Sequence, residues 1–244
     1  MPEPLRPRNP AVVAAARLHR MRHRRESGRT LIEGPHLIEE ALAAGVVIET
    51  AFALPDDRAT FSAGEALGFE VIPVAEAALA RLADTKTPRG PVAVIPIPAG
   101  DAGYLGDILV AHGLSEPGNL GALIRTAAAF GWGVAYTPGS ADPWSPKTLR
   151  AGSGGHFRTT LIRLDDLDQL TEWTTVATVV EGGMPPSEVS SGPYAVLVGD
   201  EAAGLPHEIA EECDVQVTIP MPGGTESLNA GVAAGIVVYE LSFR

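Results

Sequence analysis

Hydrophobic positions recur along this chain with two different periods, one typical of helices and one of strands. In the first hundred residues helices and strands are predicted in alternation. The expected helices are 11–25, 35–44, 60–67 and 76–82, and the expected strands are 30–33, 46–54, 70–74 and 92–97. Alternating elements of this length favour a small α/β sandwich.

In the second half the strands read as continuous apolar runs, which are typical of a parallel sheet covered on both faces. The expected strands are 105–111, 133–136, 157–162, 175–180, 194–198 and 215–219, and the expected helices are 119–130, 147–151, 164–173 and 227–243. The stretch PIPAGDAG at 96–103 is rich in helix and strand breakers. We therefore predict two domains, 1–98 and 104–244.

The closing helix consists almost wholly of small and aliphatic residues and follows a Pro/Gly loop. Ser227 stands just before the apolar run and is expected to be its N-cap. Gly231 and Gly235 lie inside this helix, where each glycine costs about 1 kcal/mol relative to alanine. We expect another segment to approach the helix backbone closely.

Composition excludes several classes of protein. No apolar run reaches the roughly 18 residues that a membrane span needs. A single cysteine, Cys213, excludes an internal disulfide framework and a cysteine-rich zinc site. The N-terminus lacks the pattern of a signal peptide, so a cytoplasmic location is expected.

Charge is distributed unevenly along the chain. The net charge is −12, yet residues 1–29 hold eight arginines against two glutamates, a local charge of +6. The other residues therefore carry −18. Such asymmetry is typical of a local contact with a polyanion, although a solvated basic helix face would give the same pattern.

Two basic segments of the second half could carry chemistry. Arg125 lies in the otherwise apolar stretch NLGALIRTAAAFG, where a buried charge would need a partner, and Asn119 can cap that helix. Lys147 and Arg150 flank the Gly/Ser loop of PKTLRAGSGGHF. That loop could hold phosphates, or it could be only a flexible turn.

A third segment, VLVGDEAAGLP at 196–206, ends a predicted strand. Its glycines have the spacing of a phosphate loop, but Leu205 and Pro206 stand where Lys and Ser/Thr are required. No GxGxxG motif opens a helix either, which weakens the alternative of a nucleotide-dependent enzyme. What remains is Gly199 directly after a strand, with the carboxylates of Asp200 and Glu201 beside it.

Three segments in this order, NLGALIRTAAAFG, LVGDEAAGLP and IPMPGGTESLNAGVAAGIVVYE, resemble the three motifs of the SpoU/TrmH family of RNA ribose 2′-O-methyltransferases. The resemblance covers residues 107–243. The segments LHRMRHRRESGRTLIEGPHLIEEALAAG and LADTKTPRGPVAVI are similar to that family's L30e-like substrate-binding domain. Glu116 and Asp200 depart from the common family pattern.

The resemblance implies a fold and a cofactor. The fold is α/β, with a C-terminal trefoil-knotted domain, whose mainly parallel sheet is flanked by helices, preceded by the smaller L30e-like domain. S-adenosylmethionine is the implied methyl donor, without a metal, and the knotted domains are expected to pair into a homodimer. The residues implied for catalysis are Arg125, Asn119, Glu201, Ser227 and Asn229. Those implied for cofactor binding are Leu197, Gly199, Ile219, Met221 and Leu228.

RNA contacts are expected on basic residues of both halves, namely Arg17, Arg20, Arg22, Arg24, Arg25, Lys147, Arg150 and Arg158. Because the pKa of arginine exceeds about 12, we expect Arg125 to stabilise a developing alkoxide and to hold a neighbouring phosphate, not to act as a base. The expected substrate is ribosomal RNA of the large subunit (23S). Alternatives are a tRNA 2′-O-methyltransferase and a non-catalytic RNA-binding or ribosome-assembly protein.

Overall fold

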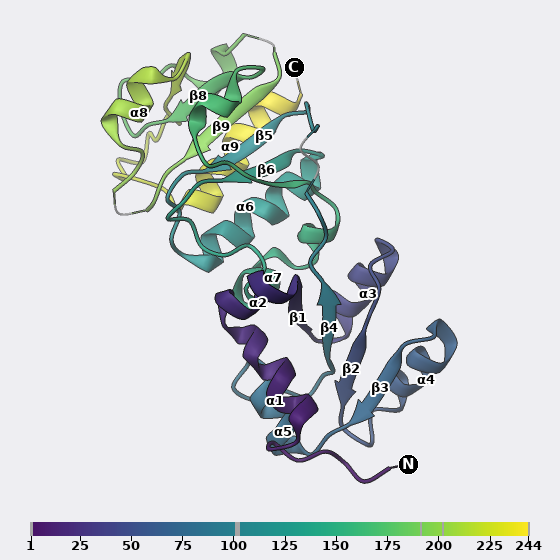
Figure 1. Cartoon of the computed structure of the whole chain (residues 1–244). Helices are drawn as coiled ribbons and strands as arrows, with labels where there is room; N and C mark the ends of the chain where they lie inside the picture. The colour runs from purple at the N-terminus through teal and green to yellow at the C-terminus, as the bar shows by residue number, and fades with distance from the viewer. Residues whose placement is uncertain (1, 101–102, 191, 202, 244) are drawn as a thin grey trace. The chain divides into compact units, whose positions relative to one another are not determined.

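The chain forms two compact units in a computed structural model that describes residues 2–100, 103–190, 192–201 and 203–243 (Figure 1). The first unit comprises Met1–Ala99 and Trp144–Phe157. The second comprises Gly100–Pro143 and Arg158–Arg244. Residues 101–102 of the predicted linker lie outside the described residues.

A four-stranded mixed sheet forms the centre of the first unit, in the order β1-β4-β2-β3. Its strands are β1 (Arg29–Glu33), β2 (Thr50–Ala53), β3 (Glu70–Pro73) and β4 (Val92–Pro96). Strand β4 is antiparallel to β1 and β2, whereas β2 and β3 are parallel. The connecting helices are α3 (Pro35–Ala43), α4 (Arg58–Leu67) and α5 (Glu76–Leu82).

The basic stretch expected as one helix at 11–25 is divided into three pieces. They are α1 (Pro10–Ala16), the 3-10 turn η1 (Arg17–His19) and α2 (Met21–Ser27). Arg20 separates the last two because its backbone is extended, with φ −93° and ψ 127°. The division lets Val12 and Leu18 enter the core of the first unit while most of the arginines stay exposed.

Residues 144–157 follow β6 (Gly133–Tyr136) in sequence but pack with the first unit. Helix α7 (Pro146–Gly152) of this segment, followed by the turn η2 (Gly155–Phe157), lies against β1. The buried hydroxyl of Thr30 donates a hydrogen bond of 2.7 Å to the carbonyl of Trp144, which is 8% exposed. Residues 144–157, which lie within the predicted domain 104–244, therefore pack as part of the first unit.

A six-stranded sheet, parallel throughout its described pairs, forms the second unit, in the order β10-β8-β9-β5-β6-β7. Its remaining strands are β5 (Ile108–Ala111), β7 (Leu161–Arg163), β8 (Thr174–Thr178), β9 (Tyr194–Val198) and β10 (Val215–Val217). The carboxyl ends of parallel strands meet at one edge of a sheet. The loops after β8, β9 and β10 therefore leave the sheet on the same side.

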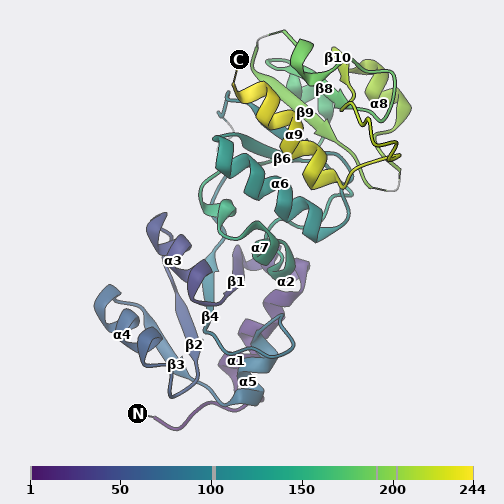
Figure 2. The same ribbon diagram turned by 180° about the vertical axis from the view of Figure 1, so that it is seen from behind.

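Helices cover both faces of this sheet, as the sequence pattern predicts. Helices α6 (Pro117–Phe130) and α9 (Ala230–Ser242) lie side by side on one face (Figure 2). On the other face, Ile108 and Val110 of β5 pack in one cluster with Leu170 of the turn η3 (Leu167–Leu170) and Ile209 of α8 (His207–Glu212). All four residues of β5 are buried, which confirms the doubly covered parallel sheet.

The helix pair α6–α9 explains one of the two glycines predicted to allow a close approach. A Cβ atom at Gly231 would lie 2.7 Å from the Cβ of Ala122 on α6, too close for any side chain. At Gly235 the nearest such atom is the hydroxyl of Thr126 at 4.0 Å, which is an ordinary contact. The prediction of a close approach therefore agrees with Gly231 and was wrong for Gly235.

Several predicted elements differ from the structure. Residues 157–162 are not one strand, because Phe157 ends η2 and β7 begins at Leu161. Of the helix expected at 164–173, only η3 forms. Helix α8 was not predicted, and η4 (Pro186–Glu188) was also missed. The α/β class and parallel sheet are confirmed, whereas the knotted path of the chain stays a prediction.

No helix among the described residues is long and apolar enough to cross a membrane.

Candidate active site

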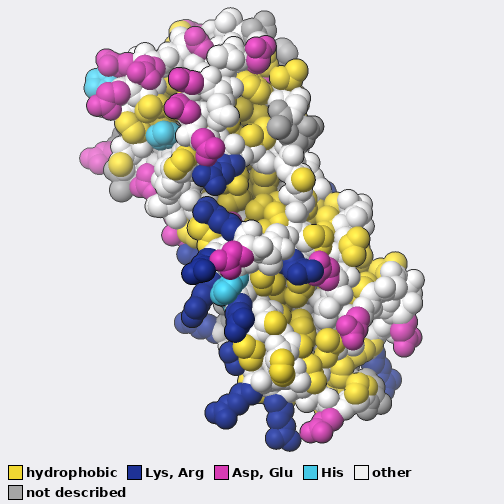
Figure 3. All heavy atoms as spheres, viewed as in Figure 1, with side chains coloured by type: hydrophobic (Ala, Val, Ile, Leu, Met, Phe, Trp, Pro, Cys, Tyr) yellow, Lys and Arg dark blue, Asp and Glu magenta, His cyan; other side chains and the backbone are white. Residues whose placement is uncertain are grey.

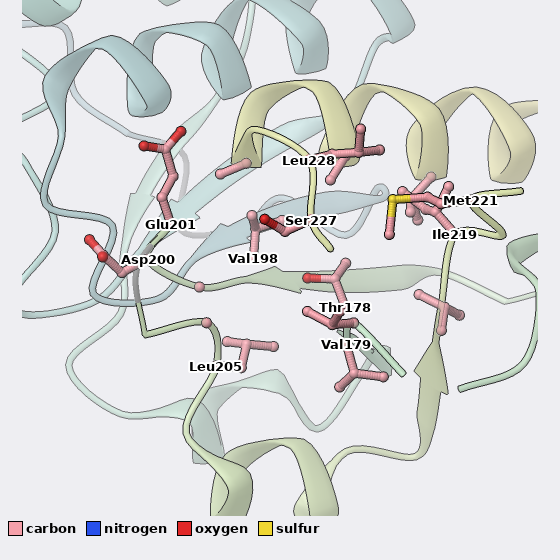
Figure 4. A pocket seen from close by; sticks show the side chains of 17 residues that line it. Thr178, Val179, Val198, Asp200, Glu201, Leu205, Ile219, Met221, Ser227 and Leu228 are labelled. Carbon is pink, nitrogen blue, oxygen red and sulfur yellow. The ribbon is translucent and has the colours of Figure 1, made fainter. Parts of the chain in front are cut away.

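A pocket of about 690 Å³, its open mouth included, lies at the carboxyl ends of β8, β9 and β10 (Figure 4). Its lining comes from the ends of these strands, from the loops that follow β9 and β10, and from the first turns of α9. Most of the lining side chains are apolar, including Val179, Leu205 and Ile219. Among the described lining residues none is Lys or Arg, so the pocket suits an uncharged or cationic ligand better than a phosphate.

The loop after β9 forms one wall of the pocket and depends on Gly199. A Cβ atom at Gly199 would overlap the carbonyl of Gly204, because the chain folds back on itself here. The amide of Gly204 donates a hydrogen bond of 2.7 Å to the carbonyl of Asp200. This turn presents Asp200 and Glu201 at the end of the pocket (Figure 4).

Asp200 connects this loop to the segment before α6. Its Oδ2 accepts hydrogen bonds from the hydroxyl of Ser115 at 2.8 Å and from the amide of Ser115 at 3.4 Å. The sequence singled out Asp200 as a carboxylate at a strand end and as a departure from the family pattern. In the structure the Asp200 side chain connects the pocket loop to Ser115, in the segment before α6.

The segment after β10 closes the pocket and ends at the N-cap of α9. Asn229, not Ser227, is that cap, because its Oδ1 accepts hydrogen bonds from the amides of Gly231 at 3.0 Å and Val232 at 3.2 Å. The expectation that Ser227 caps the helix was wrong. Ser227 instead lines the pocket, two residues before the N-cap.

Asn229 also joins three of the predicted catalytic residues into one network. Its Nδ2 donates to Oδ1 of Asn119 at 2.9 Å and to a carboxylate oxygen of Glu201. Asn119 is 7% exposed and lies in the first turn of α6, whose N-cap is Glu116 rather than Asn119. The Nδ2 of Asn119 is buried and has no hydrogen-bond partner among the described residues.

Arg125 stands apart from this network. It lies on the exposed side of α6, and no hydrogen bond or ion pair to it is found in the described part of the chain. The expectation that its charge needs a protein partner inside an apolar helix was therefore wrong. An exposed and unpaired guanidinium is instead available to a phosphate or to an oxygen of a ligand.

The structure places four of the five predicted cofactor residues in the pocket lining, namely Gly199, Ile219, Met221 and Leu228. Leu197 is different, because its side chain is buried in the core cluster beneath the sheet. Its carbonyl accepts a hydrogen bond of 2.9 Å from the hydroxyl of Thr178, which does line the pocket. Sequence reasoning missed Thr178 and Val179, since it could not tell that β8 lies beside β9.

The predicted RNA-binding arginines of the N-terminal segment fall into two groups. Arg17, Arg20, Arg22 and Arg25 are exposed, and Figure 3 shows Lys and Arg side chains gathered over α1 and α2. Arg24 is only 3% exposed and donates a hydrogen bond of 2.6 Å to the carbonyl of Leu18. The expectation that Arg24 contacts RNA is therefore corrected: its guanidinium braces the turn between η1 and α2.

The basic residues expected around the Gly/Ser loop are exposed. Arg150 forms an ion pair with Asp84 inside the first unit. Lys147 lies on α7 of the same unit, and Arg158 belongs to the second unit. Backbone conformation at the loop is special, since Ser153 is a non-glycine residue with φ 46°.

Burial shifts the pKa values of two groups in the second unit, His112 and Cys213. Burial lowers the pKa of His112, which directly follows β5. Burial also raises the pKa of the Cys213 thiol to about 11, so this thiol stays protonated at neutral pH. Among the described residues, no group of three or more His, Cys, Asp or Glu side chains is arranged to hold a metal ion.

Comparison with known proteins yields two family matches. The SpoU rRNA Methylase family matches residues 107–239, and the MRM3-like substrate binding domain matches residues 9–93. The chain is 35% identical over 233 residues to the 23S rRNA (guanosine(2553)-2′-O)-methyltransferase RlmP of Bacillus subtilis, covering 92% of this chain and 93% of that protein.

Two solved structures are similar over nearly the whole chain. The SpoU methyltransferase AviRb from Streptomyces viridochromogenes, in complex with AdoMet, has a TM-score of 0.87 at 26% identity, covering 96% of this chain and 97% of that one. An AdoMet-bound rRNA methyltransferase from Sinorhizobium meliloti has a TM-score of 0.81 at 30% identity, covering 96% and 94%.

Proposed function

Because this chain belongs to the SpoU rRNA Methylase family, we propose that it transfers a methyl group from S-adenosylmethionine to a ribose 2′-hydroxyl of RNA, with 23S rRNA as the substrate. The observation that carries the proposal is the junction of three loops at the ends of parallel strands. There the Asn119–Asn229–Glu201 network adjoins an apolar pocket without a phosphate cradle. A relative that covers the same length methylates guanosine 2553 of 23S rRNA, which supports the choice of substrate.

The residues of the pocket fit S-adenosylmethionine. The apolar side chains of Val179, Leu205 and Ile219 suit the flat faces of an adenine, and the carboxylates of Asp200 and Glu201 suit a cationic ligand. Two similar structures hold AdoMet.

When bound, S-adenosylmethionine would supply an electrophilic methyl group, so that a new O–CH₃ bond forms as the S–CH₃ bond breaks and the sulfonium becomes a neutral thioether. The ribose hydroxyl must lose its proton to solvent during this step. A guanidinium with a pKa above about 12 does not accept that proton, but it stabilises the developing alkoxide. We assign this role to Arg125, whose forked donors also suit the adjacent phosphate.

The hydrogen-bond network has a separate role in this proposal. Asn229 holds the amide of Asn119 and the carboxylate of Glu201, which lines the pocket. The Nδ2 of Asn119 is itself buried, so Asn119 acts through Asn229 by holding that side chain in place. Ser227, which lines the same pocket, contributes a further hydroxyl. These groups orient the nucleotide so that its 2′-oxygen is in line with the methyl group.

Pairing of two copies through α9 is part of the proposal. The helix exposes large apolar side chains at Val232, Ile236, Tyr239 and Phe243, spaced by three or four residues and so on one helix face. The ring centroids of Tyr239 and Phe243 lie 5.2 Å apart, and both rings also contact the ring of Phe130 on α6. An exposed apolar surface of this kind marks an interaction site. Sedimentation of the purified protein should give a dimer, and Tyr239→Glu should give a monomer.

The experiment that tests the reaction incubates the purified protein with tritium-labelled S-adenosylmethionine and separated 23S rRNA, 16S rRNA and tRNA. The label should enter 23S rRNA, and reverse transcription at low nucleotide concentration should stop at one 2′-O-methylated position. The Arg125→Ala variant should lose methyl transfer by at least about 100-fold while its affinity for S-adenosylmethionine, measured by calorimetry, stays within twofold. Labelled tRNA would change the assigned substrate, and cofactor binding without any labelled RNA would refute the reaction.

A further inference from the structure

A second concave site lies in the first unit, between the basic N-terminal segment and α5. It encloses about 690 Å³, its open mouth included, and five of its seven lining residues carry basic side chains. The full lining is Val13, Ala16, Arg17, His19, Arg20, His23 and Arg81. Arg81 comes from α5 and was not singled out from the sequence, since it is far along the chain from the arginine-rich segment.

The arginines of this basic pocket lack acidic partners. No ion pair or side-chain hydrogen bond to Arg17 or Arg20 is found in the ranges that the structure describes. Arg81 uses Nη1 to donate a hydrogen bond of 2.8 Å to the carbonyl of Pro7, which fixes the end of the guanidinium and leaves its other donors available. No carboxylate is among the described lining residues.

Two neighbouring arginines of the same segment, Arg22 and Arg24, are paired or buried and do not line the pocket. Arg22 donates to Glu26 at 2.6 Å, and Arg24 is buried. Arg17 and Arg20 of the pocket therefore carry positive charge that no acidic side chain among the described residues neutralises. This charge is held in a protein whose net charge is −12, where acidic partners are plentiful elsewhere.

Three guanidinium groups around one concavity repel one another unless an anion is present. A guanidinium presents two parallel N–H donors, which match two oxygens of one phosphate. The apolar floor of Val13 and Ala16 offers a surface for the sugar next to that phosphate. The residues therefore form a site with the chemistry of a nucleic-acid backbone.

We propose that this pocket, with Arg17, Arg20 and Arg81, binds a backbone phosphate of the RNA substrate. The inference rests on the proposed function, in that RNA is taken as the substrate, but not on the methyl-transfer step. The match of residues 9–93 to a substrate-binding domain places the pocket in the part of the chain that would contact RNA. An acidic protein segment is the competing ligand, and its carboxylates would be distinguished by competition.

The test measures binding of fluorescein-labelled 23S rRNA transcript as a function of KCl concentration. The triple variant Arg17→Gln, Arg20→Gln, Arg81→Gln should bind at least about fivefold more weakly at low salt. The slope of log K against log [KCl] should fall by about 0.7–0.9 for each phosphate that the variant no longer neutralises. Thermal unfolding of the variant should stay close to that of the wild type. Arg17 and Arg20 have no side-chain partner among the described residues, and Arg81 loses one exposed hydrogen bond to the carbonyl of Pro7.

A matched control removes the same charge elsewhere. Arg29 and Arg163 are paired with Glu49 and Asp165, and Arg58 lies on α4 outside the pocket. The triple variant Arg29→Gln, Arg58→Gln, Arg163→Gln should reduce affinity only through the general change in charge, and should keep the salt slope. Equal reductions of affinity in the two triple variants, or an unchanged slope in the first, would overturn the proposal.

Two further measurements separate this pocket from the reaction and from the competing ligand. If poly-glutamate binds the wild type but not the pocket variant, and RNA binds both equally, the pocket is a carboxylate site and the proposal is wrong. If wild-type protein methylates 23S rRNA but the pocket variant binds it normally, the pocket assignment fails alone. Pocket-dependent RNA binding without methylation would instead refute the reaction and support the pocket.

Discussion

Replacing Asn229 separates two roles that one side chain performs. Its Oδ1 caps α9 through the amides of Gly231 and Val232, and its Nδ2 donates to Asn119 and Glu201. Asn229→Ala removes both roles. Loss of an N-cap costs about 1 kcal/mol, and leaving the Oδ1 of buried Asn119 without its donor costs about 1–3 kcal/mol. We therefore expect the alanine variant to lose about 2–4 kcal/mol of unfolding free energy in the second unit.

Asn229→Ser is the matched variant that keeps only the cap. Serine is a good N-cap, but its hydroxyl is too short to reach both Asn119 and Glu201. It should lose about 1 kcal/mol less than the alanine variant. Asn229→Asp also keeps the cap, because a carboxylate oxygen can accept from the same two amides, but it places a second carboxylate beside Glu201.

The assays are thermal unfolding, hydrogen exchange of the α9 amides, and single-turnover methyl transfer. Exchange at the first turn of α9 should accelerate in the alanine variant and stay near the wild-type rate in the serine variant. Methyl transfer should fall about 10- to 100-fold in the serine and aspartate variants, because the groups that orient the ribose are no longer fixed. A serine variant with wild-type turnover would refute the positioning role, and equal stability of the alanine and serine variants would refute the cap.

Three further predictions concern stability and the pocket. Trp144→Ala should destabilise the first unit by about 3–5 kcal/mol, measured by exchange of β1 amides, and protection equal to the wild type would contradict the packing. Gly199→Ala should weaken calorimetric binding of S-adenosylmethionine by at least about tenfold, since a Cβ there overlaps the carbonyl of Gly204; unchanged affinity would show that the loop can shift. Burial lowers the pKa of His112 in the folded state, so the unfolded state binds more protons and stability should decrease as the pH falls below about 6.5. This decrease should be smaller in His112→Gln, and an identical pH dependence of unfolding would exclude His112 as its source.

Except for β7, sequence patterns located the strands of the second unit and the loops that follow them. Continuous apolar runs such as β5 and β9 mark buried parallel strands, and polar residues at their ends mark the edge where ligands bind. Gly199 was found in this way, whereas Asn229 was implied by the resemblance to the family. The order of strands in the sheet is a property of the folded chain, however, so nothing in the sequence placed Thr178 of β8 in the same pocket.

Interactions between residues distant in sequence account for the other differences. Ser227 and Asn229 are both good cap residues, and the choice between them depends on where Asn119 and Glu201 stand in three dimensions. Arg24 belongs to an arginine-rich run, and only the turn at Arg20 determines which arginine is turned inward. Local pattern gives the residue types at such positions, but it does not give their partners.

The packing of residues 144–157 with the first unit has a consequence for synthesis of the chain. Domains commonly fold from the N-terminus as they emerge from the ribosome. The buried hydroxyl of Thr30 receives its acceptor, the carbonyl of Trp144, only after β5, α6 and β6 have been made. The first unit is therefore completed when the second is already half synthesised. A nascent chain released before residue 157 would have an incomplete first unit, and the sheet of its second unit would lack β7, β8, β9 and β10.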